Sequence, residues 1–319
     1  MRIVIAGSSG LIGTALRRSC RQDGHTVIRL VRREPAAPDE ARWDPAATDS
    51  SLLDGADVVV NLAGAGLGDR RWTRARQELL LRSRTSTARS LASAAAEAAR
   101  PPKLLLSASG IRWYGIDRGD EILTESSAAT PAGFLDTVAH QWEAATAPAS
   151  DAGIPVCQLR LGLVLSRHGG VLAPMLPLFR AGLGVRFMSG REHWSYVSLT
   201  DAVRAIRFLA SRPASEGPCG PSETMRDSTG RCRMVSEGPY NITSPNPLPN
   251  RELIRALADA VGTRVVAPAP RWALRIGLGR IANEVFGGLR VIPGRLMDAG
   301  FRFAHPDPAS ALRDALDQG

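Results

Sequence analysis

Short apolar runs rich in branched side chains alternate with longer amphipathic stretches through the first half of the chain. The short runs are typical of buried strands, and the longer stretches are typical of helices. Strands and helices that alternate in this way form a doubly wound parallel sheet, so the predicted fold class is α/β. The predicted strands are 3–6, 26–31, 41–43, 57–62, 103–107 and 156–165, and the predicted helices are 11–21, 71–99 and 136–147.

The pattern becomes looser after about residue 165, where proline and glycine are more frequent. The polar stretch 211–238 shows no periodicity, and we predict that it is a mobile insertion. Asn250 is expected to cap the helix that follows it. The elements predicted beyond the insertion are a strand at 239–243, a helix at 251–261 and a broken helical segment at 268–303.

This change in pattern predicts two domains. Residues 1–165 would form the first, to which later segments return, and residues 166–319 would form a smaller mixed C-terminal α/β lobe. Pro148 should end the third helix, because proline inside a helix removes a hydrogen bond and clashes with the preceding turn. Thr200 and Asp201 should cap the helix that follows them.

A glycine-rich turn joins the first strand to the first helix. Its glycines would serve three needs: a sharp turn, close approach of the backbone to a pyrophosphate, and close packing of helix on strand. The helix N-terminus then offers unpaired N–H groups and a positive dipole end to the phosphates. A tight turn without a ligand is the alternative. The predicted dinucleotide-binding residues of this Rossmann turn are Gly7, Ser9, Gly10, Leu11, Ile12 and Gly13.

Two arginines end the second predicted strand. Sites selective for NAD place a carboxylate there to bond the ribose 2′-hydroxyl, whereas arginine accommodates a 2′-phosphate. Here Arg32 and Arg33 follow the strand, and the first carboxylate is Glu34. The guanidinium fork suits a phosphate, so the sequence predicts NADP rather than NAD as the cofactor. Two solvated arginines are the alternative.

The composition excludes several kinds of partner. The net charge of +9 comes from scattered arginines, with Lys103 the only lysine, so we expect no nucleic-acid partner. No apolar run approaches the roughly 18 residues of a membrane span, and the chain starts with a strand rather than a leader. We therefore expect a cytoplasmic protein with no membrane partner. The cysteines lack metal-type spacing, so no metal site is predicted, and Cys219 and Cys232 are expected to be free thiols.

Further motifs accompany the glycine turn, and together they are specific. They are Asn61-Leu62-Ala63-Gly64-Ala65, Ser107-Ala108-Ser109, Trp113-Tyr114-Gly115, Gly238-Pro239-Tyr240-Asn241, Pro245-Asn246-Pro247 and Gly300-Phe301-Arg302-Phe303. With these motifs the chain resembles the extended short-chain dehydrogenase/reductase superfamily, and more narrowly its atypical branch of epimerase family proteins with a small C-terminal domain of unknown function. The resemblance covers nearly the whole chain apart from the predicted insertion. It implies an NADP-binding domain with a small-molecule substrate in a cleft between it and the C-terminal lobe.

The resemblance also implies roles for individual residues. Asn61, Ala63 and Gly64 would close over the cofactor, although a plain strand-end turn is the alternative. Ser107 and Ser109 follow the fifth strand, where the superfamily keeps a serine near the reacting carbonyl; helix or turn capping is the alternative. We assign Ser107 to the cofactor and Ser109 to catalysis. Superfamily members often pair through helices of this domain, so a homodimer is possible.

The chain departs from the superfamily at its catalytic pair, a tyrosine followed four residues later by a lysine. Val138 and Trp142 stand at the two positions, and no shifted alignment restores the pair. A phenol titrates near 10 and needs such a lysine to act as a base at neutral pH. Tyr114 is the best remaining phenol, with a packing role as the alternative. Ser109 and Tyr114 are therefore the predicted catalytic hydrogen-bond donors.

The substrate side departs as well. Trp194 stands where nucleotide-sugar members place an arginine that grips the diphosphate, and Ser198 replaces a histidine. Arg191 could reach in from the preceding turn. An apolar stripe favours a small, largely apolar substrate, although a core or dimer surface is the alternative. The stripe comprises Met175, Leu176, Leu178, Phe179, Leu183, Phe187 and Met188.

Three functions follow from these patterns. The leading one is an NADP(H)-dependent oxidoreductase that reduces or isomerises a small apolar carbonyl compound or enone, with hydride chemistry supplied by the cofactor. The second is a non-catalytic NADPH-binding sensor or interaction module, which the missing pair favours. The third is a nucleotide-sugar epimerase.

Overall fold

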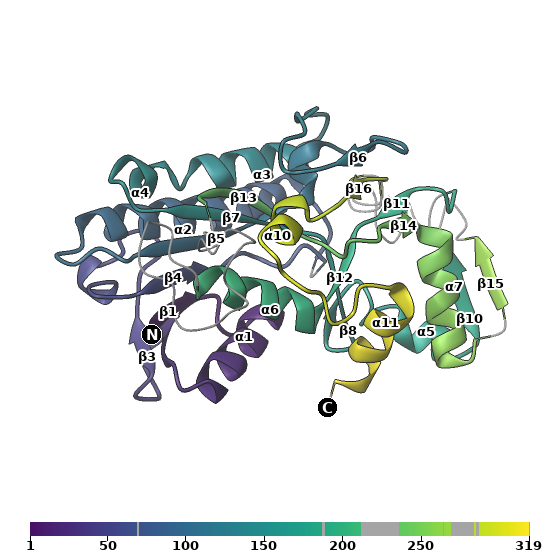
Figure 1. The fold of residues 1–319 in the computed structure, drawn as a ribbon, viewed down its shortest axis with the longest axis horizontal. Helices are drawn as coiled ribbons and strands as arrows, with labels where there is room; N and C mark the ends of the chain where they lie inside the picture. Colours follow the sequence, from purple (N-terminus) through teal and green to yellow (C-terminus); the bar gives the residue numbers. More distant parts are fainter. Residues whose placement is uncertain are drawn as a thin grey trace.

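A seven-stranded sheet forms the larger part of the molecule (Figure 1). The computed structural model describes residues 1–68, 70–186, 189–211, 236–263, 265–268, 284 and 287–318. Every neighbouring pair in the sheet is parallel, which confirms the predicted doubly wound α/β class. In spatial order the strands are β13 (Gly238–Ile242), β7 (Val156–Leu161), β5 (Leu104–Gly110), β4 (Val58–Asn61), β1 (Arg2–Ala6), β2 (Thr26–Val31) and β3 (Glu40–Arg42).

Helices cover both faces of the sheet. Ile3 and Ile5 of β1 face α1 and α6, whereas Val4 and Ala6 face the opposite layer, where Leu91 of α2 packs. This alternation follows from the strand period of two, and burial on both faces explains the unbroken apolar runs. The helices on the first face are α1 (Leu11–Gln22) and α6 (Leu199–Ala210), and those on the second are α2 (Arg74–Glu97), α3 (Phe134–Ala144) and α4 (Ala147–Asp151) (Figure 1).

Smaller elements build a second lobe at the carboxyl end of the sheet, with its own apolar core. Its strands form small sheets: β12 (Tyr196–Ser198) with β8 (Leu163–Ser166) and β9 (Gly169–Gly170), β11 (His193–Trp194) with β14 (Leu248–Pro249), and β10 (Leu183–Arg186) with β15 (Val265–Pro268). Its helices are α5 (Leu176–Arg180), α7 (Asn250–Val261) and α11 (Pro308–Asp317).

Segments from late in the chain return to the large sheet. β13 pairs with β7, and α6 packs beside α1 on one face. The remaining elements connect the two lobes or lie at strand ends: β6 (Ile122–Leu123) with β16 (Arg290–Val291), α10 (Gly294–Asp298), and the 3₁₀ turns η1 (Ser50–Leu52) and η2 (Ile111–Tyr114). Within the described part of the chain, no helix is both long and apolar enough to cross a bilayer.

The predicted strand 156–165 was wrong in one respect. It is two strands, β7 and β8, which belong to different sheets and meet at Gly162. A Cβ on Gly162 would lie 2.4 Å from the carbonyl oxygen of Ser195, so the chain crosses between lobes where only glycine fits. An apolar run alone does not reveal such a crossing.

Three predicted helix limits were also wrong. The third helix ends at Ala144, and Pro148 lies in the first turn of α4, where proline costs no hydrogen bond. Asn250 is the first residue of α7 rather than its cap, and α6 is capped by the Ser198 hydroxyl, which accepts the N–H of Asp201. Most of the predicted insertion, 212–235, and much of the predicted segment 268–303 lie outside the described residues.

Candidate functional site

The glycine turn between β1 and α1 is as tight as the sequence predicts. Gly7 has φ +80°, and a Cβ there would lie 2.6 Å from the carbonyl group of Leu62. A Cβ on Gly13 would lie 2.2 Å from the carbonyl oxygen of Gly7. At Gly10, by contrast, the nearest atom would be this same oxygen at 3.4 Å, so Gly10 turns its free side away from the protein. Two glycines therefore shape the turn, and one leaves it open.

Backbone N–H groups without an acceptor in the helix lie at this open side of the turn. Gly10 is the N-cap of α1, and no side chain caps the helix. The N–H groups of Leu11, Ile12 and Gly13 thus have no acceptor within the helix. Ser9 lies exposed beside them. The arrangement is suited to an anion at the N-terminus of a twelve-residue helix.

The two arginines at the end of β2 differ in their surroundings. Arg33 forms a two-pronged pair with Glu40 of β3, with Nη1–Oε2 and Nη2–Oε1 distances of 2.8 and 2.6 Å. This guanidinium and the N–H of Ala36 lower the pKa of Glu40 to about 2. Arg32 is exposed and has no hydrogen bond or ion pair in the part of the chain that the structure describes. Only Arg32 is thus free to meet a new phosphate without giving up a carboxylate.

Unpartnered polar atoms gather beside the last residue of β4. The prediction that Ser107 and Ser109 follow the fifth strand was wrong, because β5 runs on to Gly110 and contains both serines. Asn61 and Ser107 stand opposite each other in the parallel register. Asn61 Oδ1 accepts the N–H of Ala63 at 3.1 Å, but Asn61 Nδ2, Ser107 Oγ and Trp142 Nε1 are buried without a partner among the described residues. Each such atom costs about 1–3 kcal/mol unless something bonds to it. A polar ligand or water molecule bound beside the last residue of β4 would satisfy these atoms.

A buried network takes the place of the missing catalytic pair. Val138 and Trp142 are both buried in α3. One residue beyond Trp142, Glu143 accepts the Ser109 hydroxyl at 2.8 Å. Arg160 of β7 clamps the same carboxylate, with Nε–Oε1 and Nη2–Oε2 distances of 2.8 and 2.9 Å. The Ser109 hydroxyl is thereby linked to a charged pair that the motifs did not reveal.

Tyr114 belongs to this network rather than to an open cleft. Its side chain is fully buried. The hydroxyl donates a hydrogen bond to Asn241 Oδ1 at 2.8 Å and accepts one from Arg160 Nη1 at 3.0 Å. Burial raises the pKa of Tyr114, although Arg160 opposes the shift. With both hydrogen bonds filled by protein groups, the phenol has no free contact for a substrate. The packing alternative for Tyr114 is the one this geometry favours.

The sequence contains weak signals for Glu143, Arg160 and Asn241, which were not predicted as site residues. Glu143 is a carboxylate beside the buried Trp142 on a largely apolar helix, and Arg160 is a lone charge inside an apolar strand. Each breaks the local pattern, and a buried charge requires a partner. Asn241 lies likewise within the buried part of β13. Their pairing depends on three elements that only the fold brings together.

The residues expected to bind substrate lie elsewhere. Trp194 is buried in the core of the second lobe, so no side chain at that position is available to grip a diphosphate. Arg191 is exposed on a turn. The apolar stripe does not form a cleft: Met175, Leu176 and Phe179 are core residues. Leu178 and Leu183 are exposed, and Phe187 and Met188 lie outside the described residues.

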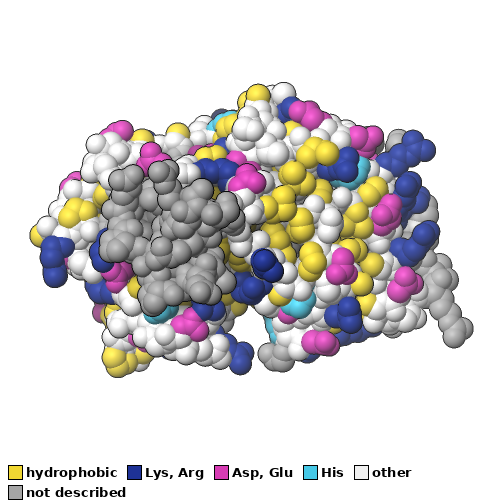
Figure 2. Space-filling view, in the orientation of Figure 1, with side chains coloured by type: hydrophobic (Ala, Val, Ile, Leu, Met, Phe, Trp, Pro, Cys, Tyr) yellow, Lys and Arg dark blue, Asp and Glu magenta, His cyan; other side chains and the backbone are white. Residues whose placement is uncertain are grey.

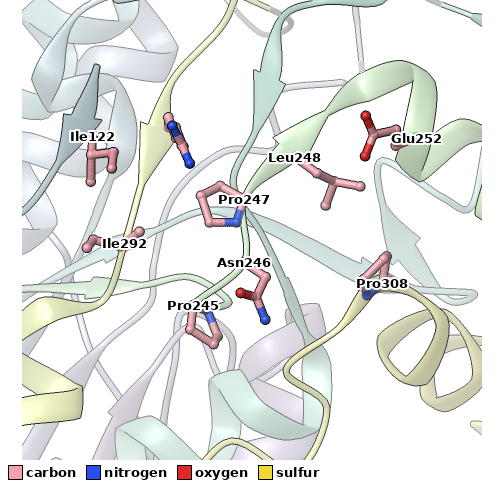
Figure 3. A pocket seen from close by; sticks show the side chains of 9 residues that line it. Ile122, Pro245, Asn246, Pro247, Leu248, Glu252, Ile292 and Pro308 are labelled. Atoms are coloured by element: carbon pink, nitrogen blue, oxygen red, sulfur yellow. The ribbon is translucent and has the colours of Figure 1, made fainter. Parts of the chain in front are cut away.

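A separate hollow of about 390 Å³ opens on the face of the molecule seen in Figure 2, among gathered apolar side chains. Figure 3 shows Pro247 at its centre and Glu252 at one side. None of the predicted site residues lines it, so it is distinct from the glycine turn. Basic and acidic side chains are interspersed over the same face. The lining residues are Ile122, Pro245, Asn246, Pro247, Leu248, Glu252, Arg290, Ile292 and Pro308.

Comparison with known proteins places this geometry in context. Residues 3–220 match the model described as the NAD dependent epimerase/dehydratase family, and residues 269–315 match a domain of unknown function, DUF1731. An epimerase family protein of Mycobacterium bovis is 38% identical over 313 residues, which cover 97% of this chain and 96% of that protein. The epimerase family protein SDR39U1 of Bos taurus is 30% identical, covering 99% of this chain and all of that protein.

A solved structure is similar over the same extent. The crystal structure of human epimerase family protein SDR39U1 (isoform2) with NADPH superposes with a TM-score of 0.84 at 28% identity. The match covers 99% of this chain and 100% of that chain. The similarity therefore includes both lobes.

Proposed function

Because the chain belongs to the NAD dependent epimerase/dehydratase family, we propose that it is an NADP(H)-dependent oxidoreductase for a small carbonyl compound or enone. The observation that carries the proposal is the open glycine turn continued by unpartnered polar atoms at the end of β4 and on the neighbouring residue of β5. The apolar stripe no longer supports an apolar substrate, since its central residues are core. We therefore propose the reacting group of the substrate, a carbonyl or an enone, and not the polarity of the rest of the substrate.

The strand order sets how a dinucleotide would lie. β1 is flanked by β2 on one side and by β4 and then β5 on the other. With the pyrophosphate at the N-terminus of α1, the half that carries Arg32 would hold the adenosine end, and the Asn61–Gly64 loop and Ser107 would hold the nicotinamide end. NADP is favoured because Arg32 is free for a 2′-phosphate, and the human relative was crystallised with NADPH.

Ser109 would hold the carbonyl oxygen of the substrate. NADPH, when bound, would supply the hydride. The Ser109 hydroxyl, which donates to Glu143 in the structure, would turn to donate a hydrogen bond to the carbonyl oxygen, and water would supply the proton that completes the product. Arg160 holds the Glu143 carboxylate in place, and Glu143 in turn holds the Ser109 hydroxyl until substrate binds. We therefore keep Ser109 as the proposed catalytic hydrogen-bond donor, with Glu143 as the group behind it.

The experiment is a turnover assay across a panel of carbonyl compounds and enones, followed by NADPH absorbance. We expect oxidation of NADPH with at least one compound, and we expect Ser109→Ala to lose that turnover while it still binds NADPH. NADPH binding without oxidation across the panel would contradict the oxidoreductase proposal.

NADPH binding without turnover would favour a non-catalytic NADPH-binding sensor or interaction module. One observation supports this alternative: Tyr114, the best remaining phenol, is fully buried with both hydrogen bonds filled. The sensor alternative predicts a partner protein that is recovered only when the cofactor is present. Nothing comparable favours a nucleotide-sugar epimerase, because Trp194 is buried where a diphosphate contact would be needed.

A further inference from the structure

Arg84 is a buried guanidinium directly behind the loop that follows β4. Only 8% of the residue is exposed. Its Nη1 donates to the carbonyl oxygen of Leu80 at 3.0 Å, and its Nη2 donates to that of Ala65 at 2.9 Å. A Cβ on Gly64 would lie 3.3 Å from Arg84 Cζ, so the guanidinium packs against the loop backbone itself. The loop predicted to close over the cofactor therefore has a cation beneath it.

No counter-ion for this cation stands in the part of the chain that the structure describes. No carboxylate pairs with Arg84 among the residues that the structure describes, and the two carbonyls use only part of its five N–H donors. The ring of Trp142 covers it, with the centroid 5.2 Å from Cζ. Burial, and to a smaller extent Arg76, lowers the pKa of Arg84 to about 10. The side chain is therefore charged at neutral pH.

The carboxylate that follows Trp142 on α3 does not neutralise Arg84. This carboxylate, Glu143, is already paired with Arg160. Arg84 therefore places a positive charge behind the loop after β4, at a buried position where charges act more strongly than in water.

We infer that Arg84 makes this protein bind NADPH more tightly than NADP⁺. The inference rests on the proposed function, which lays the nicotinamide end of the cofactor over the loop after β4 and over Ser107 of β5. The oxidised nicotinamide ring carries a positive charge and the reduced ring carries none, so Arg84 repels only the oxidised form. Inside a protein, where the effective dielectric constant is about 20, we expect this repulsion to make a roughly tenfold difference in affinity.

A preference for NADPH would affect each of the two candidate functions. An oxidoreductase with this preference would rest with the reduced cofactor bound and would act as a reductase. The same cation would stabilise negative charge that develops on a substrate oxygen during reduction. A sensor with this preference would respond to the ratio of NADPH to NADP⁺ rather than to their sum. In either case Arg84 sets which redox state occupies the site.

The test compares dissociation constants for the two cofactor forms, measured by nicotinamide fluorescence for NADPH and by displacement for NADP⁺. For the wild-type protein we expect the ratio Kd(NADP⁺)/Kd(NADPH) to be about ten or more. Arg84→Gln should bring the ratio close to one, and Arg84→Lys, which keeps the charge, should preserve most of it. Arg89→Gln, an exposed arginine on the same helix, is the matched control and should leave the ratio unchanged.

Several results would overturn the inference. A wild-type ratio of one or less does so without any variant, even if Arg84→Gln fails to fold. A folded Arg84→Gln variant with the wild-type ratio also does so, as does an Arg84→Lys variant that loses the ratio as fully as Arg84→Gln. If folded wild-type protein binds neither form, the proposed function itself fails, and the two failures are thus distinguishable.

Discussion

The adenosine end and the nicotinamide end of the proposed cofactor site are built in different ways. The first is local: β1, the glycine turn, α1 and β2 come from the first 31 residues, and backbone geometry does most of the work. The second is assembled from β4, β5, α2, α3, β7 and β13, through buried side chains that lie far apart in the chain. The comparison teaches that the local glycine turn can stay intact in a family member while the buried side chains beside it differ from the family's catalytic pair.

The glycine turn offers the largest test of this comparison. Gly13→Ala would place a Cβ 2.2 Å from the carbonyl oxygen of Gly7, so we expect NADPH affinity to fall at least about a hundredfold. Calorimetry with NADPH measures the loss. Gly68→Ala is the control, because nothing lies within 4 Å of its added Cβ. Wild-type affinity in the folded Gly13→Ala variant would show that the turn is not the phosphate site.

Gly10→Ala sharpens the same test. Its Cβ meets only the Gly7 carbonyl oxygen, at 3.4 Å, so the thermal midpoint should change little while NADPH affinity falls about tenfold. A fall in stability without a fall in affinity would mean that Gly10 serves the fold rather than the ligand.

The buried network should yield the next effect, on stability rather than affinity. Glu143→Ala leaves Arg160 buried and unpaired, and breaking such a pair costs about 3 kcal/mol in the free energy of unfolding. Urea denaturation measures this loss. Glu97→Ala, at an exposed glutamate of α2, should change stability by less than about 0.5 kcal/mol. Similar small losses for both variants would contradict the network.

The smallest expected effect concerns the ion pair at the adenosine end. Arg33, together with the N–H of Ala36 and with Arg29, lowers the pKa of Glu40 to about 2 from an ordinary value of 4.5. A carboxyl with a lowered pKa stabilises the fold fully above about pH 4.5, and this contribution is lost as the pH falls toward 2. Glu40→Gln should therefore be less stable than wild type at pH 7, and the difference should shrink between pH 4.5 and 2. A constant difference in urea midpoint would contradict the pairing.

Much of the fold could be predicted from the sequence because its signals are local. Thr26–Val31 was predicted to the residue, since a run bounded by polar residues defines its own limits. The break at Gly162 could not be predicted, because it depends on the Ser195 backbone of another strand. Pro148 gave a wrong end for the third helix, because a proline can end one helix or lie in the first turn of the next, as it does in α4.

The candidate site likewise has a part that local sequence predicts and a part that depends on contacts made by the fold. The turn residues from Gly7 to Gly13 lie together as predicted, although their role toward the cofactor stays a prediction. Glu40 was missed as the partner of Arg33, since only the pairing of β2 with β3 brings the two side chains together. Arg84 was missed because a charge on a long polar helix is usually solvated, and its burial depends on Trp142 of α3.

The central claim is that a 2′-phosphate is recognised at the end of β2, and calorimetry with NADPH and NADH tests it most directly. We predict that wild-type protein binds NADPH at least about tenfold more tightly than NADH, and that Arg32→Ala removes most of this preference while Arg33→Ala removes less. Equal affinity for the two dinucleotides, or no heat with either, would contradict the account.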